Sequence, residues 1–132
     1  MSVAAPKHIR TPLGHVLGRG SARSGTGHFW RQRLTAVANI PLTIAVIVIF
    51  IMLLGSSQAA VARILGSPAV AVIMLLFVVS ITTHMRIGMQ VVIEDYVHDE
   101  LAKFVLVMAN TFFAIAVALT SIYGILKLSF GL

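Results

Sequence analysis

The segment that decides the fold is AVAVIMLLFVVSITTHMRIGMQVVIEDYVHDE, residues 69–100. Its first half is aliphatic, and its second half places His84 and Arg86 in an otherwise apolar run before an acidic cluster. About 20 predominantly apolar residues in a helix cross the hydrocarbon layer of a membrane. Ionisable side chains inside such a helix are costly to bury, so they are candidates for function. We therefore expect a membrane-spanning helix here that carries a site at its second half.

The composition places the whole chain in the same class. Of its 132 residues, 58% are hydrophobic and 11% are charged, and the mean hydropathy is +0.98. A soluble domain carries roughly a quarter charged residues. The absence of cysteine excludes disulfides, iron–sulfur ligation and thiolate zinc sites within this chain.

Two further apolar runs, residues 36–54 and 101–126, flank the central segment. We predict an all-α membrane domain over 29–132, with three transmembrane helices at about 34–55, 68–95 and 101–127. Gly, Ser and Pro punctuate the connection over 55–68, and its middle is predicted to form a short interfacial turn of helix.

Basic residues are concentrated before the first apolar run, whereas all acids follow the second. Residues 1–28 contain no acid and no long apolar region, so a secretory signal is not expected. A mitochondrial transit peptide has a similar composition, but we favour a mobile cytoplasmic tail that fixes the orientation of the helices. The N-terminus and the end of the second helix are then cytoplasmic. Nucleic-acid binding is not expected.

One stripe of the second helix gathers the candidate site. At 100° per residue, His84, Gly88 and Asp95 share this stripe with Phe77, Ser80, Ile81 and Val91. Gly88 lies one turn beyond His84, where the missing side chain lets a flat ligand or another helix approach closely.

Three roles for His84 remain open from the residues alone. It can bond a neighbouring helix, relay protons, or ligate a haem iron axially. The other histidines lie outside the spanning segments, so a bis-histidine haem would need its second ligand from another subunit; they are His8, His15, His28 and His98.

Two interfacial segments each have a structural and a functional interpretation. Asp95 and Tyr96 are either solvated residues at a helix end or a quinone site, in which the phenol donates to a carbonyl and the carboxylate orients it or supplies a proton. Gln32 and Arg33 either anchor the first helix at the interface or bind an anionic or carbonyl group.

The run from His84 to Tyr96 resembles the signature of the hydrophobic membrane anchor subunit of succinate dehydrogenase, respiratory complex II. In that family, a histidine is followed by glycine four residues later and by Asp-Tyr eleven and twelve residues later. This chain matches all four positions. Residues 33–36, Arg-Leu-Thr-Ala, also resemble that family's Arg-x-Thr-Ala entry to its first helix. The resemblance covers roughly residues 28–127.

The resemblance implies a role for each residue of the motif. His84 would be one axial ligand of a b-type haem, shared with a histidine of a partner cytochrome b556-type subunit. Tyr96 would bind a ubiquinone carbonyl with Asp95 beside it, and Arg33 would lie near a haem propionate or the quinone, with His28 close by.

The same resemblance implies the surroundings of the chain. It would form half of a heterodimeric helix bundle on which the flavoprotein and iron–sulfur subunits dock at the cytoplasmic face. The bacterial inner membrane is the expected location, ahead of the mitochondrial inner membrane. The alternatives are a small proton-coupled transporter subunit that uses His84 and Arg86, and an assembly protein in which His84 only packs.

Overall fold

The computed structural model describes Thr11, Leu13 and residues 25–131. Residues 25–131 form three long helices, α2 (Gly25–Leu53), α4 (Pro68–Tyr96) and α5 (Glu100–Phe130), and one short helix, α3 (Gln58–Leu65). Three of them, α2, α4 and α5, are long and apolar enough to cross a membrane. The prediction of an all-α protein with three spanning helices is therefore confirmed. Most of the basic tail predicted over 1–28 lies outside the described residues.

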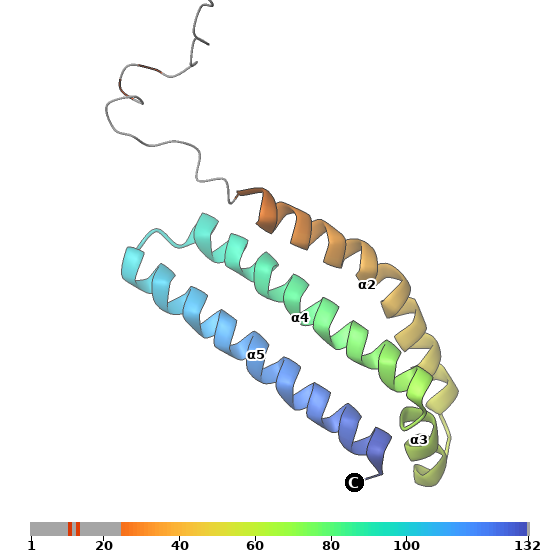
Figure 1. The fold of residues 1–132 in the computed structure, drawn as a ribbon. Helices are drawn as coiled ribbons and strands as arrows, with labels where there is room; N and C mark the ends of the chain where they lie inside the picture. The colour runs from red at the N-terminus through yellow and green to blue at the C-terminus, as the bar shows by residue number, and fades with distance from the viewer. Residues whose placement is uncertain (1–10, 12, 14–24, 132) are drawn as a thin grey trace, which may run out of the picture.

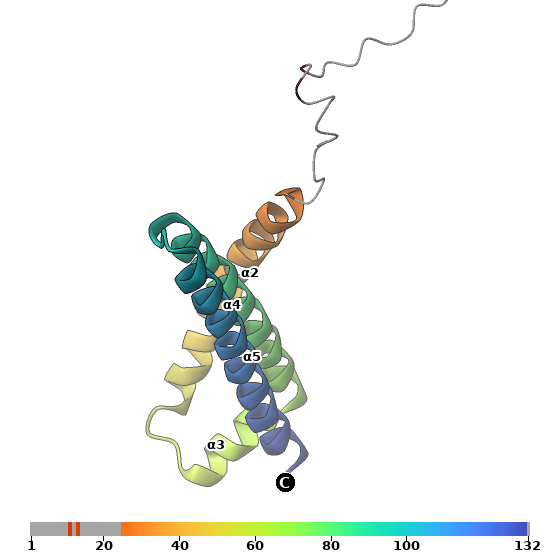
Figure 2. The ribbon, with the colours of Figure 1, turned by 90° about the vertical axis from the view of Figure 1, so that its left-hand side faces the viewer.

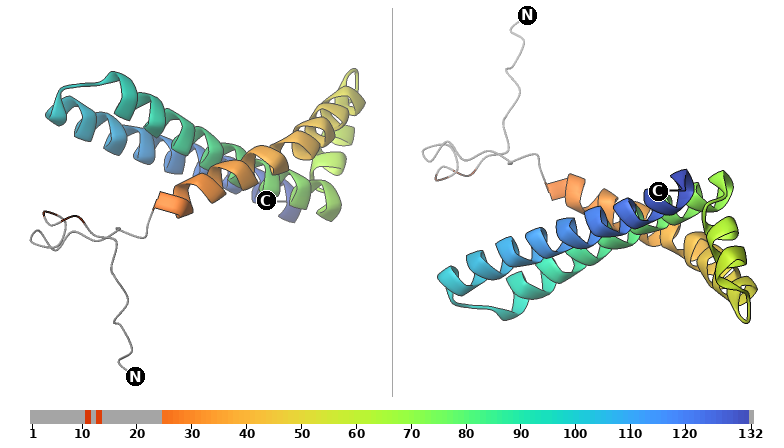
Figure 3. Two further views of the ribbon diagram at one scale, coloured as in Figure 1. Left: turned by 90° about the horizontal axis from the view of Figure 1, so that it is seen from above. Right: turned by 90° about the horizontal axis from the view of Figure 1, so that it is seen from below.

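Helix α4 is the centre of the structure and packs against both α2 and α5 (Figure 1). Helices α4 and α5 run antiparallel as a hairpin, whereas α2 crosses them at an angle (Figures 2 and 3). The start of α2 and the end of α4 lie at the same end of the molecule, and α3 lies at the other end (Figure 1). The candidate site residues in the first turns of α2 and the last turns of α4 therefore lie at the same end of the molecule.

Local signals explain where the helices begin. The Asp99 carboxylate accepts the backbone N–H of Ala102 at 2.7 Å and caps α5, and the Ser57 hydroxyl caps α3 in the same way. Pro68 opens α4 at a position that has no intrahelical N–H bond to lose. The short helix expected in the first connection is present as α3.

Helix α2 begins at Gly25, well before the start at about residue 34 that the apolar run indicates. The interfacial residues continue the helix, and His28 and Gln32 among them line a groove with α4. Pro41 lies inside α2. It removes the N–H that would bond the Val37 carbonyl, which permits the bend of α2 seen in Figure 1.

Burial in the described residues is concentrated on α4. The buried side chains are Ala71, Val78, Ser80, Thr82, Ile87 and Ile93 on α4, with Val46, Ile49 and Ala114 on its neighbours. Large apolar side chains such as Phe50 and Phe112 are exposed on the outer faces. In a membrane such faces contact lipid or the helices of other chains.

The end of α3 approaches α5 closely at Gly66. A Cβ built there would lie 2.8 Å from the carbonyl oxygens of Ala62 and Leu128. Both atoms belong to backbone, which cannot move aside as a flexible side chain would. The absence of a side chain at Gly66 therefore lets the first connection pack on the last turns of α5.

We predict that Gly66→Ala lowers the stability of the detergent-solubilised protein by about 1 to 3 kcal/mol, because the added methyl group overpacks this contact. Thermal unfolding measures the effect. Gly124→Ala is the matched control, since nothing lies within 4 Å of its Cβ position and alanine favours a helix by up to about 1 kcal/mol. Equal melting temperatures for the two variants would contradict the close approach.

Candidate functional site

His84 lies on the face of α4 that packs against α2. Its Nδ1 atom is 3.1 Å from the hydroxyl oxygen of Thr35 on α2, and the contact is partly buried. These two residues are 49 positions apart in the sequence. The histidine that the sequence singles out is thus held by a polar contact across the interface of two spanning helices.

The Thr35 hydroxyl is also bonded to its own helix. Its oxygen is 2.8 Å from the Arg31 carbonyl oxygen and 3.0 Å from that of Gln32. A hydroxyl has one proton to donate, and the shorter backbone contact takes it. We therefore assign to His84 the tautomer in which its Nδ1–H donates to Thr35 Oγ1. The neutral ring consequently carries its free lone pair on Nε2.

A second polar contact fixes the same turn of α2. Ser80, one turn before His84 and buried, donates its hydroxyl to the Thr35 carbonyl oxygen at 3.4 Å. Ser80 and His84 therefore both contact Thr35 from α4, which sets the register of the two helices. One turn further along α2, the buried Asn39 Oδ1 has no hydrogen-bond partner in the described residues.

An open groove of about 390 Å³ lies between the start of α2 and the end of α4. Four α2 residues and two α4 residues line it: His28, Phe29, Gln32, Arg33, Ile87 and Val91. Imidazole, amide and guanidinium groups thus line one side, and aliphatic side chains line the other. Such a groove can hold a flat ligand that has a polar edge.

Arg33 is held at the rim of this groove by its neighbour one turn back. Its guanidinium carbon is 4.5 Å from the ring centre of Phe29. A cation–π contact at an exposed site contributes about 0.5 to 1 kcal/mol. No carboxylate of the described residues pairs with Arg33, so the guanidinium is available to an anion or a carbonyl.

Gly88 faces Gln32 across the groove. A Cβ built at Gly88 would lie 3.8 Å from Gln32 Nε2, which is ordinary contact. Within this chain an alanine therefore fits at position 88. A requirement for glycine would come only from a ligand or another helix, so the close approach expected at Gly88 stays a prediction.

Asp95 and Tyr96 lie on the last turn of α4, at the same end of the molecule as the groove. Both are exposed, and the side chain of Tyr96 is 78% accessible. Neither side chain bonds another described residue. The groove reaches α4 only as far as Val91, one turn before Asp95. The structure therefore brings His28 and Arg33 together but leaves the Asp95–Tyr96 pair outside the groove.

His84 and Arg86 do not share a pathway. His84 contacts α2, whereas Arg86 lines a hollow between α4 and α5. Two residues apart on a helix, they leave α4 about 160° from one another. The transporter interpretation required them to cooperate, and this geometry gives it no support.

Thr35 is the functional candidate that reasoning from the residues missed. It appeared only as part of the Arg-x-Thr-Ala resemblance, without a role. The feature that could have indicated it is a hydroxyl side chain at the same level of the bundle as His84. The sequence does not show that α2 packs against α4, so the contact could not be deduced from it. In the described part of the chain, no three His, Asp or Glu side chains lie close enough together to bind a metal ion.

The chain has three helices that are long and apolar enough to cross a membrane, a hydrogen-bonded histidine between two of them and a polar groove at one end. These features define a multi-pass helical membrane protein. Residues 7–118 match the family described as the succinate dehydrogenase/fumarate reductase transmembrane subunit. The chain belongs to this family of membrane anchor subunits, as the resemblance of its motifs indicated.

Two relatives support the assignment. The chain is 30% identical to the succinate dehydrogenase hydrophobic membrane anchor subunit of Paracoccus denitrificans, over 92% of this chain and 93% of that protein. It is 28% identical to the subunit of the same description from Rickettsia bellii, over 81% of this chain and 86% of that protein. No solved structure gave a significant match.

We predict that Thr35→Val destabilises the contact of α2 with α4 by about 1 kcal/mol. Valine keeps the shape but leaves the His84 Nδ1–H without an acceptor. Thr35→Ser retains the hydroxyl and is expected to unfold close to the temperature of the unmodified protein in detergent. If the valine and serine variants unfold at the same temperature, the hydroxyl does not hold His84.

Proposed function

We propose that this chain anchors a succinate:ubiquinone oxidoreductase in the membrane, shares a b-type haem through His84 and completes a ubiquinone site near Asp95, Tyr96 and Arg33. The observation that carries the proposal is the hydrogen bond between His84 and Thr35 at the α2–α4 interface. Family membership gives the class of complex, and this contact supports His84 as the residue of the proposed redox role.

The His84 side chain suits the axial position of a haem. Haem iron is bound by a neutral imidazole nitrogen, and ligating histidines typically donate their other N–H to an oxygen. With Nδ1–H directed to Thr35, Nε2 is the atom available to iron. When bound, haem would supply a one-electron carrier inside the membrane. His28 lies in the first turns of α2, about 10 Å along that helix from Thr35, and His98 lies in the loop between α4 and α5. A second histidine ligand would therefore come from a cytochrome b-type partner subunit.

Asp95 and Tyr96 suit a site where a quinone takes up protons. Both ring oxygens of a quinone must gain protons on reduction, so the site needs donors close to water. The Tyr96 hydroxyl can donate to one carbonyl, and the neighbouring carboxylate can orient it or pass a proton. Because Tyr96 is 78% accessible in the chain alone, the remaining wall of this site has to belong to other subunits.

Arg33 and His28 suit the polar edge of one of these ligands. They line the groove at the end of the molecule where α4 finishes, and they are free of acidic partners among the described residues. A guanidinium there can bind a haem propionate or polarise a quinone carbonyl. The flavoprotein and iron–sulfur subunits would dock at this same end, which positive-inside counting makes cytoplasmic in a bacterial inner membrane.

Replacing His84 by alanine tests the ligand. We expect the purified complex to lose its b-type α-band in the reduced-minus-oxidised spectrum, because one axial nitrogen is gone. His98→Ala, in the loop between α4 and α5, is the control and should leave the band in place. An unchanged band in the His84 variant would remove the haem from this chain.

Replacing Tyr96 by phenylalanine tests the quinone site. The rate of ubiquinone reduction by succinate should fall by about tenfold or more, since the variant lacks the donor to the carbonyl. Succinate oxidation by an artificial dye that bypasses the membrane site should be retained. Tyr123→Phe, near the opposite end of the bundle, controls for loss of a phenol. Equal loss of both activities would assign Tyr96 to assembly instead.

A further inference from the structure

Arg86 carries a charge within α4 that no described residue neutralises. Its guanidinium makes no hydrogen bond or ion pair in this part of the chain, where the one ion pair joins Lys103 to Glu100. Arg86 lies about 15 Å along the helix axis from the end of α4 at Tyr96. An arginine at that depth in a membrane is costly unless it has a counter-charge.

The acids of this chain cannot provide that counter-charge. All four lie within residues 94–100. The nearest one, Glu94, accepts a hydrogen bond from Gln90 at 2.8 Å and lies about 12 Å further along α4 than Arg86. A second copy of the chain in the same membrane orientation would also carry its acids near the end of α4, too far along the helix axis to reach Arg86. An anion that pairs with Arg86 would therefore belong to a different molecule.

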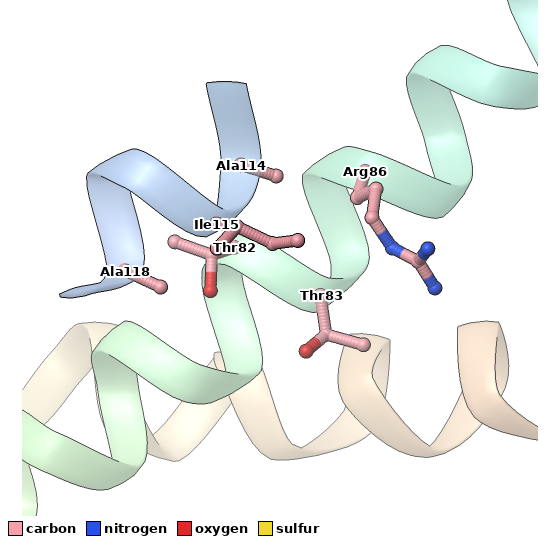
Figure 4. A pocket seen from close by; sticks show the side chains of 6 residues that line it. All are labelled: Thr82, Thr83, Arg86, Ala114, Ile115 and Ala118. Carbon is pink, nitrogen blue, oxygen red and sulfur yellow. The ribbon is translucent and has the colours of Figure 1, made fainter. Parts of the chain in front are cut away.

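The surroundings of Arg86 can receive another helix. Arg86 lines a hollow of about 140 Å³ between α4 and α5, together with Thr82, Thr83, Ala114, Ile115 and Ala118 (Figure 4). Most of these side chains are small, which allows the backbone of a packed helix to come close. Across the helix pair, Asn110 donates to the Arg86 carbonyl oxygen at 2.9 Å and holds this turn of α4 against α5.

The position of Arg86 along α4, about 15 Å from the end of the helix at Tyr96, argues against a partner at the membrane surface. Side chains on a helix tilt toward its N-terminus, which for α4 points away from the acidic end. The threonines that line the hollow with Arg86 precede it in sequence and lie on that side. A lipid phosphate sits at the membrane surface and is therefore a poor partner at this depth. The haem proposed at His84 is also badly placed, because His84 leaves α4 about 160° from Arg86.

We infer that Arg86 binds the carboxylate of an aspartate or glutamate on a transmembrane helix of a partner subunit, packed across the hollow between α4 and α5. A guanidinium and a carboxylate form two parallel hydrogen bonds, which fix orientation as well as supply charge. The pair would register the two membrane subunits. This inference rests on the proposed function in one respect, namely that a partner membrane subunit exists.

The test begins with the purified complex, isolated through an affinity tag on this chain. Arg86→Gln should reduce the amount of partner membrane subunit recovered by about tenfold or more, because it leaves a buried carboxylate unpaired. Arg86→Lys keeps the charge and should retain more of the partner. Arg63→Gln is the control, since it removes a charge from an exposed position on α3.

Crosslinking identifies the partner helix without altering Arg86. A photoreactive phenylalanine analogue in place of Ile115, which lines the hollow, should crosslink to a helix that contains an acidic residue. The same analogue in place of Phe113, which faces a different hollow, should not reach that helix. Replacing the identified acid by its amide should restore recovery of the partner with Arg86→Gln, because no charge is then left unpaired.

Three results would overturn the inference. The first is full recovery of the partner membrane subunit with the Arg86→Gln variant. The second is a crosslink from position 115 to a helix that contains no acidic residue. The third is recovery of the partner subunit with Arg86→Gln once anionic phospholipid alone is added. If Arg86→Gln cannot be purified, the crosslink in the unaltered background decides. A failure of the proposed function looks different, since the unmodified complex would then contain neither haem nor a partner membrane subunit.

Discussion

The hydrogen bond between the His84 imidazole and the Thr35 hydroxyl is the contact on which the site depends. It joins α2 to α4 in the apolar part of the bundle, and the Ser80 hydroxyl adds a second bond to the same turn. Apolar side chains alone would let two lipid-facing helices slide past each other, because lipid is as apolar as they are. A polar contact with a defined direction sets their register. It also decides which nitrogen of His84 is free for a ligand.

The rest of the bundle leaves large apolar faces uncovered within this chain. Helix α4 is covered by α2 and α5, while the outer faces of all three helices expose large apolar side chains. Polar groups interrupt these faces at few places, of which the groove at Arg33 and the hollow at Arg86 are two. A charged or polar group on a lipid-facing surface is costly. Such groups therefore mark where ligands and partner helices are expected.

Much of this architecture is predictable from the sequence, for physical reasons. The cost of unbonded backbone in lipid leaves helices as the form for long apolar runs, so three spans follow from composition. The spacing from His84 to Tyr96 was sufficient to indicate the family. The pairing with Thr35 was not predictable, because periodicity assigns a residue to a face but not to a neighbouring helix. The early start of α2 was missed since its first turns are interfacial rather than apolar. The exposure of Tyr96 likewise depends on how α4 ends.

One measurement tests the central claim most directly: the optical spectrum of the unmodified chain, purified from membranes with whatever subunits accompany it. The account predicts a b-type α-band that appears when succinate is added, with a second membrane subunit in the preparation. A colourless preparation that contains only this chain would contradict it. His84 would then hold α2 and α4 together without taking part in electron transfer.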